Sequence, residues 1–322
     1  MSKNHQEIIG VIIPCYKVKN HILNVIKEIG VEVNKIYVID DFCPEKSGKY
    51  VEEFCHDERV CVLYNKKNLG VGGATMRGYQ EAIKDKIDIV VKVDGDFQMD
   101  PKLIPQFIAP IINRRADYTK GNRFFNPDDV MSMPFIRLFG NAILSFLNKF
   151  SSGYWNIFDP TNGYTAIHVK VITYLNLDKI DKGYFFESDI LFRLNIIRAK
   201  ILDVPMRANY GEEQSNLSIK KIITPFLFKH FRNTFKRIAY NYYIRDFSFA
   251  SIMLVMGLVL TSFGVIYGAN AWLDSVYQNK FSSSGVVMIA TLPIILGVQL
   301  ILSFINYDIS STPQNPLLTY LE

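Results

Sequence analysis

The chain has 322 residues, of which 49% are hydrophobic and 21% charged, and its mean hydropathy is slightly positive at +0.09. This length exceeds one minimal domain and can bury a full α/β core with residues left over. The hydropathy argues against a purely soluble enzyme and predicts that part of the chain meets lipid. The net charge of +5 is modest, so the placement of the basic residues is more informative than their number, and we expect no nucleic-acid partner.

The beginning of the chain indicates a reduced compartment and no export signal. All four cysteines lie in the first fifth of the sequence: Cys15, Cys43, Cys55 and Cys61. They form no CxxC pair and have no histidine at zinc-ligand spacing, so reduced cytosolic thiols are the simpler interpretation. The apolar run from Ile8 is broken at Pro14, far short of a signal peptide or a membrane span. We therefore expect the N-terminal part to stay in the cytoplasm.

From residue 8 to about 207, short β-branched runs alternate with longer helix-like stretches. Candidate strands are residues 8–14, 35–40, 60–65, 88–94, 118–123 and 201–205. Candidate helices between them are residues 21–30, 46–56, 71–84 and 102–114. This alternation predicts a mainly parallel sheet covered by helices, in which ligands bind at the carboxyl ends of the strands.

The segment 217–246 has a different character, with seven Lys or Arg residues between 218 and 245 and no acidic residue in that interval. Seven aromatic residues are interleaved with them, which suits amphipathic helices in a lipid headgroup layer. Lys236 and Arg237 are candidates for contact with a lipid phosphate. An ordinary basic surface helix is the alternative.

Two uncharged apolar stretches follow, at about 247–268 and 285–305, and each is long enough to cross a hydrocarbon core as a helix. They predict a transmembrane hairpin within residues 247–322, with buried helices of a soluble core as the alternative. The basic flank before the first span predicts that the N-terminal domain, residues 1–216, and both termini are cytoplasmic. We expect a two-span protein of a bacterial inner membrane.

Carboxylates follow the apolar strand that ends in VKVDGDFQMDP. Asp94 and Asp96 are two residues apart, so in an extended chain both side chains point the same way and can converge on one cation. Mg²⁺ or Mn²⁺ accepts such hard oxygen ligands and can bridge them to a diphosphate. A polar turn closing a strand is the alternative for an isolated DxD pair.

Two further segments suit a nucleotide. Asp41, at the end of another strand, can accept hydrogen bonds from ribose or base, as acidic residues do in nucleotide-binding α/β folds. Asn68 and Gly70 begin a glycine-rich run at the entry to a helix, where backbone N–H groups can approach phosphate or ribose. The run does not match the G-x-G-x-x-G fingerprint because Thr75 occupies its third glycine position, which counts against an NAD site.

Taken in order, these segments resemble a known family. The series is IIPCYK, VIDDFCPEKS, NLGVGGATMRGYQEA, VDGDFQMDP, DYTKGNRF, DPTNGYTAI and FFESDILFRL. It resembles the inverting glycosyltransferase family 2 over residues 8–217, and the C-terminal hairpin is similar to that of its polyprenyl-phosphate branch. The resemblance implies a GT-A fold, a Rossmann-like mixed sheet with helices on both faces, and a metal-dependent hexosyltransferase.

The resemblance also implies roles for residues on the donor side. Pro14 and Tyr16 would line the base pocket and Asp41 would contact the nucleoside. Asp94 and Asp96 would hold the metal and the diphosphate, with Gln98 beside the metal. Together with Asn68 and Gly70, these residues make up the expected donor site.

The resemblance also implies that Arg123 and Arg137 bind a phosphate of the donor or of the acceptor, which suits a guanidinium because it binds oxygens bidentately. Simple surface exposure of these arginines is the alternative. Asp159 occupies the position of the family's catalytic carboxylate, and Glu187 and Asp189 resemble its acidic motif near the acceptor. A phosphate monoester has its second pKa near about 6, so most acceptor needs no base at neutral pH. Asp159 therefore either orients the acceptor or deprotonates only its monoanion.

Some positions depart from the family pattern. The usual Gly-Ser after the nucleoside-binding aspartate is Phe42-Cys43, and a common arginine is replaced by Thr165. Near Tyr210, Glu212 and Glu213 stand where related mannose synthases carry a basic residue. These departures leave the donor sugar and the acceptor contacts open.

The sequence as a whole predicts transfer of a sugar from a nucleotide diphosphate, with UDP favoured, to polyprenyl phosphate such as undecaprenyl phosphate, for modification of cell-envelope glycans. One alternative is a transferase that elongates a lipid-linked oligosaccharide or an O-antigen or capsule repeat unit. A processive polysaccharide synthase would carry more spans and a QxxRW-type motif. A membrane-tethered nucleotide-binding scaffold would have no use for Asp96 and Asp159. Homo-oligomerisation stays open.

Overall fold

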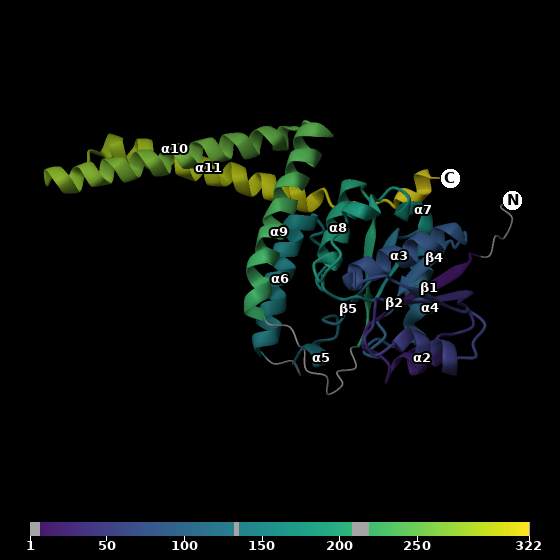
Figure 1. Ribbon diagram of the computed structural model, residues 1–322. Coiled ribbons are helices and arrows are strands. Elements are labelled where there is room, and N and C mark those ends of the chain that lie inside the picture. Colours follow the sequence, from purple (N-terminus) through teal and green to yellow (C-terminus); the bar gives the residue numbers. More distant parts are fainter. Residues whose placement is uncertain (1–6, 132–134, 208–218, 322) are drawn as a thin grey trace. The chain divides into compact units, whose positions relative to one another are not determined.

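The computed structural model describes residues 7–131, 135–207 and 219–321, without the side chains of 128–129, 136–137 and 219–223 (Figure 1). It divides into two compact units. The first comprises Met1–Thr234 together with Pro313–Glu322, and the second comprises Phe235–Thr312. The sequence predicts boundaries at residues 216 and 246 and assigns the C-terminal tail to the membrane part.

The first unit is built on one seven-stranded sheet of order β3-β2-β1-β4-β6-β5-β7. The strands are β1 (Ile9–Cys15), β2 (Lys35–Asp40), β3 (Val60–Tyr64), β4 (Ile89–Lys92), β5 (Tyr118–Asn122), β6 (Thr165–His168) and β7 (Ile201–Pro205). Strand β6 runs antiparallel to both of its neighbours, β4 and β5, whereas all other pairs are parallel. The predicted mainly parallel sheet is confirmed, but β6 was missed.

Helices lie between and after these strands. They are α1 (Ile22–Glu28), α2 (Ser47–Phe54), α3 (Gly70–Lys84), α4 (Ile104–Ile112), α5 (Pro127–Met131), α6 (Phe135–Ser152), α7 (Val169–Ile172), α8 (Phe186–Ile196) and the long α9 (Ile219–Ala239), with short 3₁₀ turns at Pro101–Leu103 and Leu177–Lys179. The central strands β1 and β4 are almost wholly buried, which explains their near-continuous Ile and Val content. The parallel connections bring the carboxyl ends of β1, β2 and β4 to one edge of the sheet.

The C-terminal tail belongs to the first unit. Its 3₁₀ turn, η4 (Leu317–Tyr320), presents the backbone N–H groups of Leu317 and Leu318 to the carboxylate of Asp117, at 2.7 and 2.9 Å. Asp117 is fully buried and also accepts from the N–H of Lys200. Because the side chain of Leu318 is only 1% exposed, the tail contributes apolar area to the core of the catalytic unit.

We expect the substitution Leu318→Ala to lower the free energy of unfolding of the first unit by about 2–4 kcal/mol, because it leaves a cavity in a packed site. Thermal unfolding of the purified full chain, followed by near-UV circular dichroism, measures the effect as a lower midpoint. Tyr320→Ala is the matched control, since the side chain of Tyr320 is exposed in the same turn. Equal midpoints for the two variants would show that the tail does not stabilise the unit.

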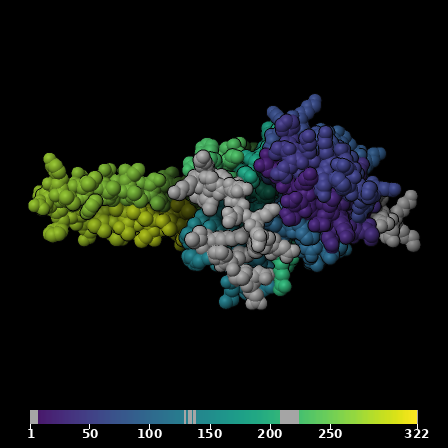
Figure 2. Space-filling view, turned by 60° about the horizontal axis from the view of Figure 1, so that its bottom comes forward, coloured from purple at the N-terminus to yellow at the C-terminus, as the bar shows by residue number. Residues whose placement is uncertain are grey.

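The second unit contains two long apolar helices, α10 (Phe249–Gln278) and α11 (Ser284–Ser310), preceded by a π-helical turn, η3 (Tyr240–Ile244). Figure 2 shows the two helices packed against each other along their length. A Cβ atom on Gly257 would lie 2.9 Å from the carbonyl oxygen of Gly297, so this close approach requires glycine. Both helices are long and apolar enough to cross a membrane, and little of either is buried within the protein.

The bounds of the hairpin differ from the prediction. Helix α10 continues to Gln278, ten residues beyond the predicted end of the first span, so the connection is much shorter than the expected loop of 269–284. The polar residues of 269–278 lower the hydropathy of this stretch, but they do not interrupt its helical hydrogen bonds. The hydropathy of the sequence predicted the apolar length of the first span but not the helical residues 269–278 that follow it.

Candidate active site

A cavity of about 410 Å³ opens at the carboxyl ends of β1, β2 and β4 in the first unit. Seven residues expected in the donor site line it: Pro14, Tyr16, Asp41, Asn68, Gly70, Asp94 and Asp96. The lining also includes Gly183 and Tyr184, which no motif had singled out. Gln98 is not among the lining residues; its backbone N–H donates to Asp96 Oδ1 at 3.1 Å. The structure thus brings together segments that are up to 170 residues apart in sequence.

The carboxylate of Asp41 is engaged by the protein itself. It accepts hydrogen bonds from the backbone N–H groups of Leu69 and Gly70 and from the side chain of Asn65, all between 2.7 and 3.1 Å. Gly70 has a φ of +80°, a left-handed conformation that favours glycine. Asp41 therefore shapes the entry to α3, where the glycine-rich run meets the cavity.

A buried lysine lies beside the DxD pair. Lys92, the last residue of β4, is fully buried and places its Nζ 2.6 Å from Asp94 Oδ1 and 4.0 Å from a carboxylate oxygen of Glu187. Burial works against the charged form of this lysine, but the two carboxylates outweigh it and raise its pKa. Lys92 therefore fixes one oxygen of Asp94, and both Asp94 and Asp96 line the cavity.

These two carboxylates fit a divalent ion of the Mg²⁺ type. Among the described residues, no group of three or more His, Cys, Asp or Glu side chains gathers as a metal site. Mg²⁺ is usually bound by one or two carboxylates and completes its coordination with water and substrate phosphates. A cavity wall with two carboxylates and open space beside them matches that pattern better than a closed structural site.

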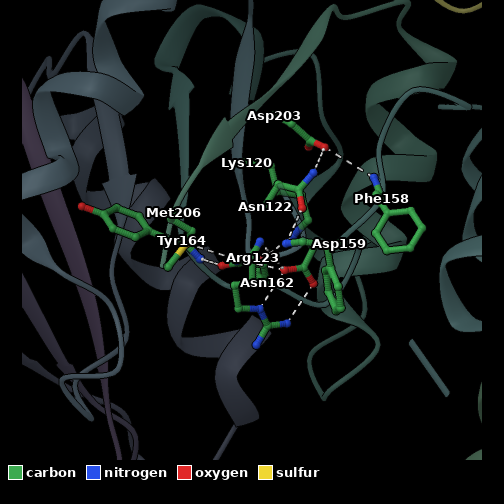
Figure 3. A network of polar contacts seen from close by, with 10 residues as sticks. Lys120, Asn122, Arg123, Phe158, Asp159, Asn162, Tyr164, Asp203 and Met206 are labelled. Atoms are coloured by element: carbon green, nitrogen blue, oxygen red, sulfur yellow. Dashed lines mark hydrogen bonds and ion pairs between the residues drawn. The ribbon is translucent and has the colours of Figure 1, made fainter. Parts of the chain in front are cut away.

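Arg123 and Asp159 form a bidentate ion pair. Arg123 Nε lies 2.7 Å from Asp159 Oδ2 and Nη2 lies 2.8 Å from Oδ1, and Figure 3 shows the two side chains pointing toward each other. Asp159 is 2% exposed and also accepts from Arg123 N–H and from Asn162 Nδ2. The expected catalytic carboxylate and the expected phosphate-binding arginine are thus direct partners.

Further buried ionisable groups lie beside this pair. Lys120 on β5 donates to the carbonyl oxygen of Asn162, and burial lowers its pKa to about 8. Asp203 on β7 accepts from Asn122 Nδ2 at 2.8 Å, and burial raises its pKa to about 6. Neither Lys120 nor Asp203 was singled out from the sequence. A lysine within an otherwise apolar strand is a signal that could have found Lys120 and Lys92.

The two acidic residues of the FFESD segment face different surroundings. Glu187 lies close to Lys92, and burial raises its pKa despite the nearby Lys92 and Lys120 charges. Asp189 is 1% exposed and accepts from Asp181 N–H, Arg193 Nε and Asn233 Nδ2. The carboxylate of Asp189 thus binds neighbouring elements of the fold.

The remaining expected acceptor residues are placed as follows. In the second unit, Arg237 is 2% exposed and forms a bidentate pair with Asp308, with N to O distances of 2.6 and 2.9 Å. Lys236 is exposed. The side chain of Arg137 in α6 lies outside the described residues, as do the whole residues Tyr210, Glu212 and Glu213.

The comparisons with known proteins agree with this geometry. Residues 10–175 match the sequence model of the family described as "Glycosyl transferase family 2". The match covers more than half of the chain and includes the DxD pair, Arg123 and Asp159.

The chain belongs to glycosyl transferase family 2.

Two relatives that resemble the chain are named as transferases that act on a polyprenyl phosphate. A UDP-N-acetylglucosamine--dolichyl-phosphate N-acetylglucosaminyltransferase from Methanococcus voltae is 29% identical over 220 residues, which cover 64% of this chain and 87% of the relative. An undecaprenyl-phosphate mannosyltransferase from Micrococcus luteus is 28% identical over 179 residues, or 55% of this chain and 72% of the relative. The relatives thus transfer different sugars to related lipids.

Solved structures identify the fold as GT-A. Glucosyl-3-phosphoglycerate synthase from Mycobacterium tuberculosis, in complex with Mn²⁺, UDP and glucosyl-3-phosphoglycerate, aligns with a TM-score of 0.52 at 16% identity. The alignment covers 72% of this chain and 80% of that chain. At this identity the likeness establishes the fold and leaves the substrates to other arguments. The expected GT-A fold and two apolar C-terminal helices are confirmed.

Proposed function

We propose that this glycosyltransferase moves a sugar from a nucleotide diphosphate, with a UDP-sugar favoured, to polyprenyl phosphate, and that undecaprenyl phosphate is its acceptor. The observation that carries the proposal is the cavity at the strand ends, whose lining includes Asp94 and Asp96 together with Asn68 and Gly70 of the glycine-rich run. Both named relatives use a polyprenyl-phosphate acceptor, and one of them uses a UDP-sugar.

On the donor side, Pro14 and Tyr16 line the cavity where a base would lie, and Asn68 and Gly70 border the place of the ribose and phosphates. Asp41 acts indirectly, since its carboxylate holds the N–H groups of Leu69 and Gly70. A divalent ion held by Asp94 and Asp96, Mg²⁺ or Mn²⁺, supplies positive charge for the departing nucleoside diphosphate when it is bound. Gln98 stabilises this turn through its N–H bond to Asp96.

The proposed reaction is a single in-line displacement. An oxygen of the acceptor phosphate forms a bond to the anomeric carbon, and the bond from that carbon to the diphosphate oxygen breaks, with its electron pair leaving on the nucleoside diphosphate. Configuration inverts. Arg123 binds phosphate oxygens, and Asp159 orients its guanidinium through the bidentate pair.

A lipid acceptor agrees with the surface of α9. Its inward face in the first unit is polar, with His230 and Asn233 both 1% exposed, whereas Phe228 and Phe231 are 70% and 54% exposed. An amphipathic helix of a soluble protein buries its apolar residues and exposes its polar ones. Helix α9 has the reverse arrangement, so its outer face suits lipid better than water. Lys236 extends the same helix with an exposed cation that can meet anionic headgroups.

Helix α6 adds a second apolar stripe. The exposed residues of this stripe recur every three or four positions along one side: Phe135, Phe139, Ile143 and Phe146. Helices α6 and α9 lie side by side, joined by a bond of 2.8 Å between Ser151 Oγ and His230 Nδ1 (Figure 1). We infer that both helices lie at the cytoplasmic surface of a bacterial inner membrane and confine the lipid acceptor near the site.

Arg237 has a different proposed role in view of its partner. In the second unit its guanidinium is bound bidentately by Asp308, which also accepts from Tyr242 Oη at 2.6 Å. A carboxylate at the end of an apolar helix needs such a partner. The guanidinium of Arg237 therefore neutralises Asp308 of α11, and Lys236 is the better candidate for the lipid phosphate.

Mass spectrometry of the lipid product tests the proposal directly. The purified full chain in lipid nanodiscs would receive undecaprenyl phosphate, Mg²⁺ or Mn²⁺, and a panel of UDP- and GDP-sugars. We expect one sugar joined to the monophosphate lipid. Product formed only when a lipid-linked diphosphate saccharide is supplied would replace the proposal with chain elongation, and donor hydrolysis unaffected by either lipid would contradict a lipid acceptor.

A further inference from the structure

The inward face of α9 holds the short segment that leads into α8. Lys229 Nζ lies 2.5 Å from Asp181 Oδ2, and Asn233 Nδ2 lies 2.9 Å from Asp189 Oδ1. Between these two contacts the buried ring of Phe185 packs edge-on against His230 at 4.9 Å and lies 5.4 Å from Lys229 Nζ. The segment 181–189 is therefore fixed to α9 at both of its ends and in its middle.

Asp181 uses its two carboxylate oxygens for different partners. Oδ2 pairs with Lys229, whereas Oδ1 accepts the N–H of Gly183 at 3.0 Å and so closes the turn 181–183. The backbone N–H of Asp181 donates to Asp189 Oδ2 at 3.0 Å. Because one carboxylate both closes the turn and binds α9, the shape of the turn depends on the position of Lys229.

This turn forms one wall of the nucleotide cavity. Gly183 and Tyr184 line the cavity, and the carbonyl oxygen of Lys182 accepts from the N–H groups of Gly72 and Gly73 at 3.0 and 3.2 Å. A Cβ atom on Gly70 would lie 2.5 Å from that same carbonyl oxygen. The turn is therefore fitted closely against the first turn of α3, where the donor phosphates or ribose are expected.

We propose that Lys229 is a positioning residue for the donor: through Asp181 it holds the turn that walls the nucleotide cavity, and so links the lipid-facing helix α9 to the affinity for nucleotide. The inference rests on the proposed function in that the cavity takes a nucleotide. In this role Lys229 touches neither substrate. Loss of its charge loosens the wall formed by Gly183 and Tyr184 and weakens nucleotide binding.

Calorimetric titration of UDP and GDP into the full chain in nanodiscs, with Mn²⁺ present, tests this role. We expect Lys229→Met, which keeps the length of the side chain and removes its charge, to raise the Kd for the preferred nucleotide about five- to tenfold. Lys229→Arg restores most of the affinity. Arg232→Met is the matched control because Arg232 is an exposed cation on the same helix, and we expect its Kd to equal that of the unmodified chain.

A double-mutant cycle separates positioning from general destabilisation. Asp181→Asn retains an oxygen for the Gly183 N–H but loses the ion pair, so we expect the same rise in Kd as for Lys229→Met. The double variant should bind no more weakly than either single variant, because both remove one interaction. Fully additive losses, or a Kd for Lys229→Met equal to that of the unmodified chain, would overturn the inference. Failure of the unmodified chain to bind either nucleotide would instead overturn the proposed function, and this inference with it.

Discussion

Replacing Asp96 by asparagine is expected to lower kcat/KM for sugar transfer at least about 1,000-fold, because charge on the departing diphosphate then loses its metal counterion. The asparagine side chain keeps an Oδ1 atom for the N–H of Gln98, so the turn should retain its shape. Transfer of radiolabelled sugar into the lipid phase measures the loss, and an unchanged unfolding midpoint shows that the protein is folded.

The nearby Asp100 provides the matched control for Asp96. Its Oδ1 caps a 3₁₀ turn by accepting from Lys102 N–H at 2.9 Å, and it does not line the cavity. We expect Asp100→Asn to retain transfer within about threefold, since a cap bond contributes about 1 kcal/mol to stability and nothing to the leaving group. Excess EDTA should mimic Asp96→Asn in the unmodified chain and be reversed by Mg²⁺ or Mn²⁺; full activity in EDTA would remove the metal from the proposal.

Replacing Asp159 by asparagine is expected to lower kcat about 100-fold at pH 7.5 with little change in the KM for the donor. Asparagine cannot accept two hydrogen bonds from the guanidinium of Arg123 as the carboxylate does, so the arginine loses its fixed orientation. Steady-state kinetics with saturating lipid acceptor measures the loss. Activity near that of the unmodified chain would exclude Asp159 from the reaction.

The pH profile of the Asp159 variant distinguishes its two proposed roles. Below the second pKa of a phosphate monoester, about 6, the acceptor is a monoanion that still carries a proton. If Asp159 accepts that proton, the factor by which Asp159→Asn lowers kcat grows as the pH falls from 7.5 to 5.5. If that factor stays constant over this range, the role of Asp159 is to hold Arg123. Asp100→Asn is the control, since Asp100 caps a 3₁₀ turn and does not line the cavity.

Three of the strands that the sequence predicted share one property. Strands β1, β2 and β4 are short, rich in Ile and Val and bounded by polar turns, and their local pattern agrees with their buried position. Strand β6, with the sequence TAIH, has only four residues and follows a polar segment. It is a strand because β4 and β5 lie on either side and supply its partners. The sequence of β6 itself contains no pattern that predicts this pairing.

The cavity at the strand ends was predictable to the level of segments. Parallel strands bring their carboxyl ends to one edge of a sheet, so the motifs that follow β1, β2 and β4 had to meet, and they line one cavity. The partners of individual side chains were not predictable. The sequence gives no sign, for example, that the carboxylate of Asp189 accepts hydrogen bonds from Asp181, Arg193 and Asn233.

The sequence by itself determined the family, the α/β architecture, the apolar length of two helices and the carboxylates beside the strands, because these follow from local composition and from periodicity along the chain. The tertiary structure alone decided that Lys92 pairs with Asp94, that Arg123 and Asp159 are partners, and that Lys229 pairs with Asp181. Ion pairs between residues 36 or 48 positions apart depend on distances in space. The linear order of residues does not specify those distances until the sheet has assembled.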